Sequence, residues 1–258
     1  MQKYNFFKKY RHCNRSISKI FLLLHENRIV QMTESEAIIA RHSVRQYLDK
    51  PIEAEKIEAI QECIDRCNRE GGVHIQLIAN EPKAFSSLIA KYGRFRNVNN
   101  YIAVVAPKGR QGSVAAGYWG ERLVLALQMM GLRTCWVGAS YKKDRSLFRI
   151  GADEELKCVI SFGYGANDGV QHPQKKTIAD VAEDRSTTRS FPDWFVRGVE
   201  AALLAPTAVN QQKFKFFLYD DHCVEAVAKF SLIGYAHLDL GIAKYHFEVG
   251  AGEDFDWI

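Results

Sequence analysis

Two arginines and a serine stand within five residues, at Arg41, Ser43 and Arg45, in the stretch Arg-His-Ser-Val-Arg-Gln-Tyr. Guanidinium groups donate forked, charge-assisted hydrogen bonds, and the hydroxyl adds a further donor. This spacing therefore suits a phosphate or a similar oxyanion. The alternative is a solvated basic turn before a helix, since short motifs of this kind are common.

A second copy of the pattern begins 144 residues later at Arg185 and reads Arg-Ser-Thr-Thr-Arg-Ser-Phe. Both copies follow Arg-x-(Ser or Thr)-x-Arg-x-(Tyr or Phe). The recurrence predicts an internal repeat, and it favours the anion site over the solvated turn.

Three stretches together resemble the FMN-dependent nitroreductase family. They are the Arg-His-Ser opening at 41–43, Gly131-Leu-Arg-Thr-Cys-Trp-Val-Gly138, and Ala205-Pro-Thr-Ala-Val-Asn-Gln-Gln212. The likeness covers residues 32–258 and points to the branch in which two half-sized units are fused in one chain. It implies an α+β, nitroreductase-like fold with mixed, mainly antiparallel sheets flanked by helices and an internal pseudo-dimeric duplication.

The resemblance implies an FMN site built from both units. Residues that match the family's cofactor-binding motifs are Arg41, His42, Ser43, Arg45, Trp136, Val137, Gly138, Lys175, Lys176, Pro206, Thr207 and Asn210. The residues at 41–45 and the lysine pair would hold the phosphate end, those at 206–210 would contact the ring and ribityl chain, and those at 136–138 would run beneath the ring. No catalytic side chain or metal ligand is predicted, because flavin itself carries such chemistry.

Some of these matches leave alternatives open. Trp136 also fits a core position, and the lysine pair also fits a solvated loop. The family's Pro-Trp after the third stretch is replaced by Lys213-Phe214, so the pocket wall departs from the family pattern.

Only one complete site is expected. The first-unit counterpart of 206–210 is the unrelated stretch Arg69–His74, and the second unit has no counterpart of the lysine pair. We therefore expect one FMN in a monomer that imitates a family dimer.

The function implied by the resemblance is an FMN-dependent oxidoreductase that transfers electrons from NAD(P)H to a nitroaromatic, quinone or similar small acceptor in ping-pong order. The alternative is a flavin-binding protein without substantial turnover, used for storage or sensing, because the degenerate second site shows that a site can be lost. Reductive dehalogenation and flavin fragmentation stay open within the family.

The charge distribution argues against a nucleic-acid partner. The formal charge of the 258 residues is +5, but residues 1–31 contain seven basic side chains and one acid, so the remainder is almost neutral. No apolar run reaches the roughly 18–20 residues of a membrane span, although an amphipathic stretch at 17–28 leaves weak surface anchoring as an alternative. With 47% hydrophobic and 25% charged residues, we expect a cytoplasmic globular protein.

The cysteines predict neither a disulfide framework nor a metal site. Six cysteines are widely spaced, and the pair Cys63 and Cys67 lacks a second nearby pair of ligands. We expect reduced thiols.

Periodicity predicts the elements that position the site. Thr33 and Glu36 form a capping-box pattern, so a helix should run to Ala40 and deliver the chain to Arg41. A central helix over 115–130 should end at Gly131 and lead into Thr134–Gly138. The other expected helices cover 53–71, 85–92, 195–203 and 238–249, and the other expected strands cover 74–79, 101–106, 158–163 and 214–219. We divide the chain into an N-terminal extension or accessory helix at 1–31, a first unit at 32–180 and a shortened second unit at 181–258.

Overall fold

The computed structural model describes residues 32–85, 93–142, 144, 146–252 and 255–258. The extension at 1–31 lies outside the described residues. So does the helix expected over 85–92, apart from Phe85, which ends the short 3-10 helix η2 (Pro82–Phe85).

The first sheet has four antiparallel strands in the order β1-β2-β4-β3. The bounds are β1 (His74–Ile78), β2 (Asn100–Pro107), β3 (Arg133–Val137) and β4 (Glu154–Gly163). β2 is buried from Asn100 to Ala106, as its continuous apolar sequence predicts for a central strand. β3 is one of the two edge strands of this sheet, so the 133–137 stretch lies at the sheet's edge.

The second sheet also has four strands, in the order β5-β6-β7-β8. They are β5 (Ala182–Asp184), β6 (Phe214–Leu218), β7 (Cys223–Ala228) and β8 (Asp256–Trp257). β6 and β7 are antiparallel, whereas β5 and β8 pair in parallel with their neighbours. The periodicity analysis missed β5, β7 and β8, because two of them are very short and β7 is mostly half-buried without clear alternation.

Six helices accompany these sheets in the described part of the chain. They are α3 (Glu34–Ala40), α4 (Ala54–Gly71), α6 (Gly109–Met129), α7 (Ile178–Val181), α8 (Asp193–Leu203) and α9 (Ala236–Ala251). Thr33 forms the predicted capping box with Glu36, and Gly72 ends α4 with a left-handed φ of 59°. α6 begins six residues before the predicted start at 115, because its polar first turn lies outside the apolar pattern.

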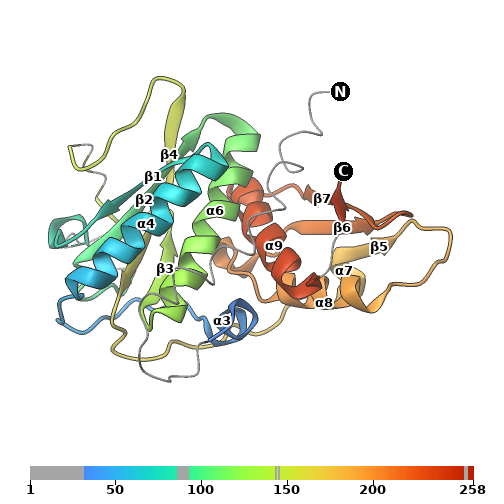
Figure 1. Cartoon of the computed structure of the whole chain (residues 1–258), viewed down its shortest axis with the longest axis horizontal. Helices are drawn as coiled ribbons and strands as arrows, with labels where there is room; N and C mark the ends of the chain where they lie inside the picture. The colour runs from blue at the N-terminus through green and yellow to red at the C-terminus, as the bar shows by residue number, and fades with distance from the viewer. Residues whose placement is uncertain (1–31, 86–92, 143, 145, 253–254) are drawn as a thin grey trace.

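Helices α6 and α9 cross between the two sheets (Figure 1), and α8 packs beside α9. The backbones of α6 and α9 come very close together at Gly117 and Gly241. A Cβ on Gly117 would lie 2.0 Å from the Leu238 carbonyl oxygen, and one on Gly241 would lie 2.0 Å from that of Val114. Only glycine at both positions lets the two backbones come this close.

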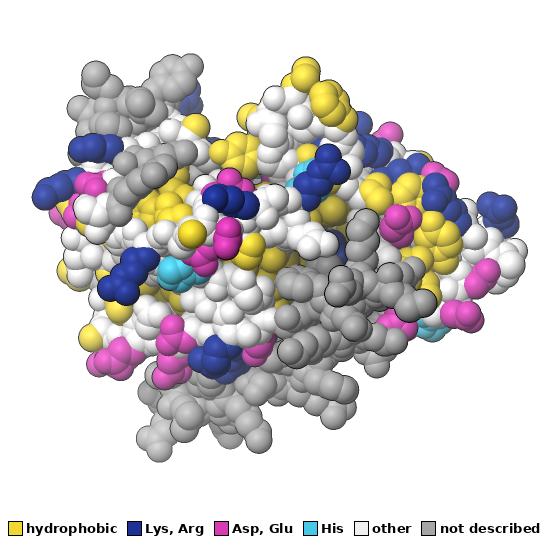
Figure 2. All heavy atoms as spheres, turned by 90° about the horizontal axis from the view of Figure 1, so that it is seen from above, with side chains coloured by type: hydrophobic (Ala, Val, Ile, Leu, Met, Phe, Trp, Pro, Cys, Tyr) yellow, Lys and Arg dark blue, Asp and Glu magenta, His cyan; other side chains and the backbone are white. Residues whose placement is uncertain are grey.

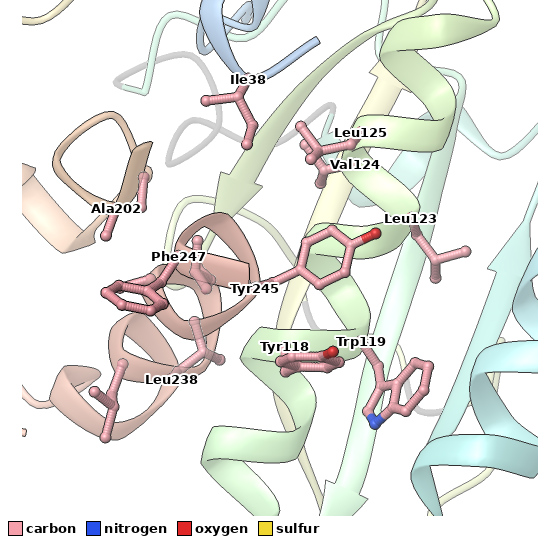
Figure 3. Packing of buried hydrophobic residues seen from close by; sticks show 14 of the residues in the cluster. Ile38, Tyr118, Trp119, Leu123, Val124, Leu125, Ala202, Leu238, Tyr245 and Phe247 are labelled. Atoms are coloured by element: carbon pink, nitrogen blue, oxygen red, sulfur yellow. The ribbon is translucent and has the colours of Figure 1, made fainter. Parts of the chain in front are cut away.

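The core fills the space around this crossing, as Figure 3 shows for the side chains near Tyr118 and Tyr245. The rings of these two tyrosines meet edge to face with centroids 5.1 Å apart. One large cluster joins residues of both sheets and both central helices. The predicted α+β, nitroreductase-like architecture is confirmed: helices accompany sheets that are mainly antiparallel, with parallel pairs only in the second sheet of the described residues.

On the face seen in Figure 2, acidic and basic side chains are interspersed and neither sign dominates. None of the helices within the described ranges combines the length and apolar character that a bilayer span requires.

Candidate functional site

A cavity of about 870 Å³ is lined by residues from both of the predicted units. It is lined by nine of the twelve predicted site residues: Ser43, Arg45, Trp136, Val137, Gly138, Lys175, Pro206, Thr207 and Asn210. Arg41 and His42 line a smaller adjoining pocket, which shares Ser43 and Pro206 with the large one. Lys176 is half-buried and lines neither pocket. Residues distant in sequence therefore meet at one place.

Backbone pairing explains how the first arginine stretch reaches this cavity. The Val44 amide donates to the Thr134 carbonyl at 2.9 Å, which lays the stretch against the start of β3. The side chains of Val44 and Tyr47 are buried, and the Tyr47 hydroxyl donates to the Val44 carbonyl at 2.7 Å. Because side chains alternate along extended backbone, Ser43 and Arg45 flank Val44 on the side of the cavity.

Arg41 is a buried cation with unused donors. Its side chain is only 5% exposed, and within the described residues its Nε and Nη1 atoms have no hydrogen-bond partner. The nearest carboxylate is Glu121, whose Oε1 lies 3.9 Å from Nε. Burial lowers the pKa of the guanidinium, and Glu121 offsets part of this effect. Buried polar groups are normally paired, so this side chain is suited to an anion that enters the pocket.

Other cations surround the same position. Burial first, and then the charges of Arg45 and Arg41, lower the pKa of His172, while burial and Arg41 lower that of His42. Lys175 adds to this positive field. Among the described residues that line the large cavity, Asp239 is the one acid. The electrostatics at this end of the cavity favour an anion with more than one negative charge.

The stretch at 206–212 forms a strained turn, which includes the 3-10 helix η3 (Ala208–Asn210). Val209, Asn210 and Gln212 have φ values of 46°, 53° and 45°. Left-handed backbone at non-glycine residues costs about 1 kcal/mol or more each and persists only where the surroundings hold it. The Asn210 side-chain Nδ2 donates to the Pro173 carbonyl at 3.2 Å, so the turn contacts the segment that carries His172.

Asp239 of α9 holds this turn. Its carboxylate accepts from the Ala208 amide at 3.1 Å and from Gln211 Nε2 at 2.7 Å. Burial raises its pKa to about 6, although both hydrogen bonds act in the opposite direction. A buried carboxylate thus offsets the strain of the turn through two donors.

Trp136 and Gly138 line the cavity, and both also contact other protein groups. The Trp136 indole packs against Gly120 and donates from Nε1 to Glu121 Oε2 at 2.7 Å, so it also packs against the core. The Tyr235 hydroxyl donates to the Gly138 carbonyl at 3.1 Å. A Cβ on Gly138 would lie 2.5 Å from that hydroxyl oxygen, so here glycine makes room for Tyr235.

Glu121 contacts side chains from three parts of the fold: Arg41, Trp136 of β3 and His246 of α9. It is fully buried, and its Oε1 lies 2.9 Å from Nε2 of the equally buried His246. His246 Nδ1 lies 3.0 Å from the Ala201 carbonyl and must donate to it, since a carbonyl only accepts. Nε2 and the carboxylate therefore share one further proton. The network fixes Glu121 between Trp136 and Arg41.

The second arginine stretch does not line this cavity. The Arg185 guanidinium lies 3.8 Å from the centroid of the Phe217 ring and donates to Glu183 and Tyr219. Its donors are used within the second sheet, in contrast to those of Arg41.

Sequence reasoning did not single out His172, Tyr235 or Asp239, which all line the cavity. Asp239 offered a usable signal, because it is an acid inside the apolar run Leu238-Asp-Leu-Gly-Ile242 of a predicted helix. The other two gave none, because a single histidine or tyrosine in a loop is usually unremarkable. Arg94 also lines the cavity.

Comparisons with known proteins agree with this fold. Residues 34–251 match the family model described as "Putative TM nitroreductase". A crystal structure of a "putative nitroreductase" from Thermotoga maritima is 23% identical with a TM-score of 0.61, and the match covers 88% of this chain and 87% of that one. None of the curated proteins compared matches this chain.

Two further structures match about half of the chain. An FMN-dependent nitroreductase from Clostridium difficile is 19% identical with a TM-score of 0.42, covering 51% of this chain and 87% of its own. A "putative nitroreductase" in complex with FMN from Desulfovibrio desulfuricans is 20% identical with a TM-score of 0.44, covering 58% of this chain and 92% of its own.

The fold and site thus define a nitroreductase-like α+β protein with a cationic cavity. The chain belongs to the putative TM nitroreductase family, and the protein is in general terms an oxidoreductase.

Proposed function

We propose that the protein is an FMN-dependent oxidoreductase that uses NAD(P)H to reduce small organic acceptors such as nitroaromatics or quinones. The observation that carries the proposal is the buried Arg41 guanidinium, which has unused donors beside Ser43, Arg45 and Lys175 at one end of a large cavity. A flavin phosphate carries close to two negative charges at pH 7 and matches this end of the cavity. The FMN complex of the Desulfovibrio relative is consistent with this choice.

The residues present fit the cofactor in charge and in size. The cavity is at the upper end of the roughly 300–1,000 Å³ range of ligand sites, so it has room for a ring system and a phosphate tail. Arg41, His42, Ser43, Arg45 and Lys175 would hold the phosphate and ribityl end. Lys176, which lines neither pocket, would contribute only its charge.

Pro206, Thr207 and Asn210, which line both the large cavity and the small pocket beside Arg41, would contact the ring and ribityl chain, while Trp136, Val137 and Gly138 would run beneath the ring. The chemistry that FMN supplies when bound is transfer of electrons from NAD(P)H to the acceptor. The protein contributes orientation, exclusion of water and a positive field that favours negative charge. Because one cavity serves both substrates, NAD(P)H and the acceptor would enter in turn, in ping-pong order.

Absorption spectra with flavin quantified after denaturation test this proposal. We expect about one FMN per chain for the wild type. The variants Arg41→Ala and Asn210→Ala should weaken FMN binding, the former by about tenfold or more, since a charge-assisted hydrogen bond is worth about 1.5–3 kcal/mol. Arg185→Ala is the matched control, because it removes the corresponding arginine of the second stretch and should leave binding unchanged.

Two results would count against the proposal in different ways. A chain that takes up no FMN even on reconstitution would remove both the cofactor and the mechanism that depends on it. A yellow protein that NAD(P)H does not reduce is instead a flavin-binding protein for storage or sensing.

A further inference from the structure

Four exposed apolar side chains lie in the two segments that border the cavity at Val209 and Ile233. Val209 is 70%, Phe230 81%, Leu232 92% and Ile233 51% exposed. They make up half of the large hydrophobic side chains that are strongly exposed in the described part of the chain. Val209 and Ile233 also line the cavity itself. We refer to these four residues as the apolar lip.

The lip is built from two segments that are fastened together. The Lys229 amide donates to the Lys213 carbonyl at 2.8 Å, and the Ser231 hydroxyl donates to Gln211 Oε1 at 2.5 Å. Gln211 in turn donates to Asp239 at 2.7 Å. The segment at 229–234 is therefore held against the turn at 206–212 and keeps a defined position at the cavity mouth.

The lip and the phosphate end differ sharply in polarity. Ser43, Arg45 and Lys175 line the cavity with polar and cationic groups, whereas Val209 and Ile233 line it with exposed apolar side chains. An apolar surface that continues out of a ligand cavity is suited to a ligand that extends beyond the cavity, because exposed apolar patches commonly mark binding sites. The cavity is also large enough to hold an acceptor ring in addition to a cofactor.

We propose that the apolar lip binds the hydrocarbon tail of an electron acceptor whose reducible ring lies in the cavity, so that the preferred acceptors are alkylated, for example tailed quinones. The inference rests on the proposed function for its redox step. In that step NAD(P)H gives up a hydride, which is two electrons and one proton. The quinone takes up these and one proton from solvent to become the quinol.

A series of quinones with one ring and tails from methyl to decyl, used below their micelle concentration, tests the lip. Full burial of a methylene is worth roughly fourfold in affinity, and a lip covers only one side of a chain, so we expect about twofold in kcat/KM per methylene on the lip. The double variant Phe230→Ser, Leu232→Ser should flatten this dependence. Its activity with the methyl compound should match the wild type, since neither residue lines the cavity.

Leu48→Ser is the matched control, because Leu48 is 50% exposed but does not line the cavity, and it should keep the full dependence on tail length. The dissociation constant of each quinone in the series is also measured for the FMN-reconstituted protein, by tryptophan fluorescence quenching without NAD(P)H. This binding measurement needs no turnover, so it tests whether the lip binds the tail even if the chain proves inactive. An inactive protein would count against the proposed function alone.

The proposal is overturned if wild-type dissociation constants do not change with tail length. It is equally overturned if the double variant keeps the wild-type dependence, because the tail then binds elsewhere. A dependence that the double variant loses and Leu48→Ser keeps is the supporting result.

Discussion

At the scale of single residues, position decides what the same side chain does. Arg41 and Arg185 begin matching stretches, yet Arg41 is buried with unused donors, while Arg185 stacks on Phe217 and pairs with Glu183. Arginine donors left unpaired in a buried site mark a place for an anion, whereas donors satisfied by protein groups do not. The difference supports a cofactor role for Arg41 only.

Asp239 gives a residue-scale prediction about pH. Burial raises its pKa from the ordinary value of 3.8 to about 6, so between these values the folded protein holds a proton that the unfolded chain has lost. The stabilisation is complete below pH 4 and is lost as the pH rises through 6. Relative to Asp239→Asn, the wild type should therefore lose about 2 kcal/mol of unfolding free energy between pH 4 and pH 7.

Urea unfolding at both pH values measures this difference. Asp65→Asn, an exposed change on α4, is the control and should show no such dependence. A constant offset between wild type and Asp239→Asn across this range would mean that Asp239 keeps an ordinary pKa.

At the scale of elements, the crossing of α6 and α9 supports the whole site. α6 carries Glu121, α9 carries Asp239, and the two helices are joined by the contact between Glu121 and His246. The glycines at 117 and 241 set how closely the helices pack. A change in this packing would shift the arginine pocket and the 206–212 turn relative to each other.

Gly117→Ala should destabilise the protein by about 2 kcal/mol. Alanine gains up to about 1 kcal/mol of helix propensity, but its Cβ would lie 2.0 Å from the Leu238 carbonyl oxygen, and such overpacking costs about 3 kcal/mol. Chemical denaturation provides the measurement. Gln111→Ala, at an exposed position in the same helix, is the control and should not destabilise. Equal stability of Gly117→Ala and wild type would contradict the close crossing.

At the scale of the whole molecule, one chain holds two sheets and the helix pair between them. The cavity takes residues from both predicted units, including Ser43 from the first and Asn210 from the second. A single chain can therefore build the composite site that the family resemblance assigns to two units.

We predict a monomer with one FMN. Light scattering coupled to gel filtration should give a mass near 29.4 kDa that does not change with protein concentration. The stoichiometry should be one flavin per chain, because Arg185 uses its donors within the second sheet. A mass of two chains, or two flavins per chain, would show that a further site or interface exists.

Much of this protein was predictable from local sequence. The capping box at Thr33, the stop at Gly72 and the buried strand Asn100–Pro107 follow from hydrogen-bonding side chains, a left-handed glycine and hydrophobic periodicity. These signals act over a few residues, so they can be read from the sequence alone. The motifs also supplied the predicted site residues, nine of which line the cavity.

Tertiary structure decided the rest, because it depends on contacts between distant residues. Packing determines that Arg41 is buried, that Asp239 holds the 206–212 turn, and that Trp136 bonds to Glu121. The short strands β5 and β8 exist because β6 and β7 offer them backbone partners. Burial and pairing energies of this kind arise only when the whole chain has folded, so they cannot be predicted from any single stretch of sequence.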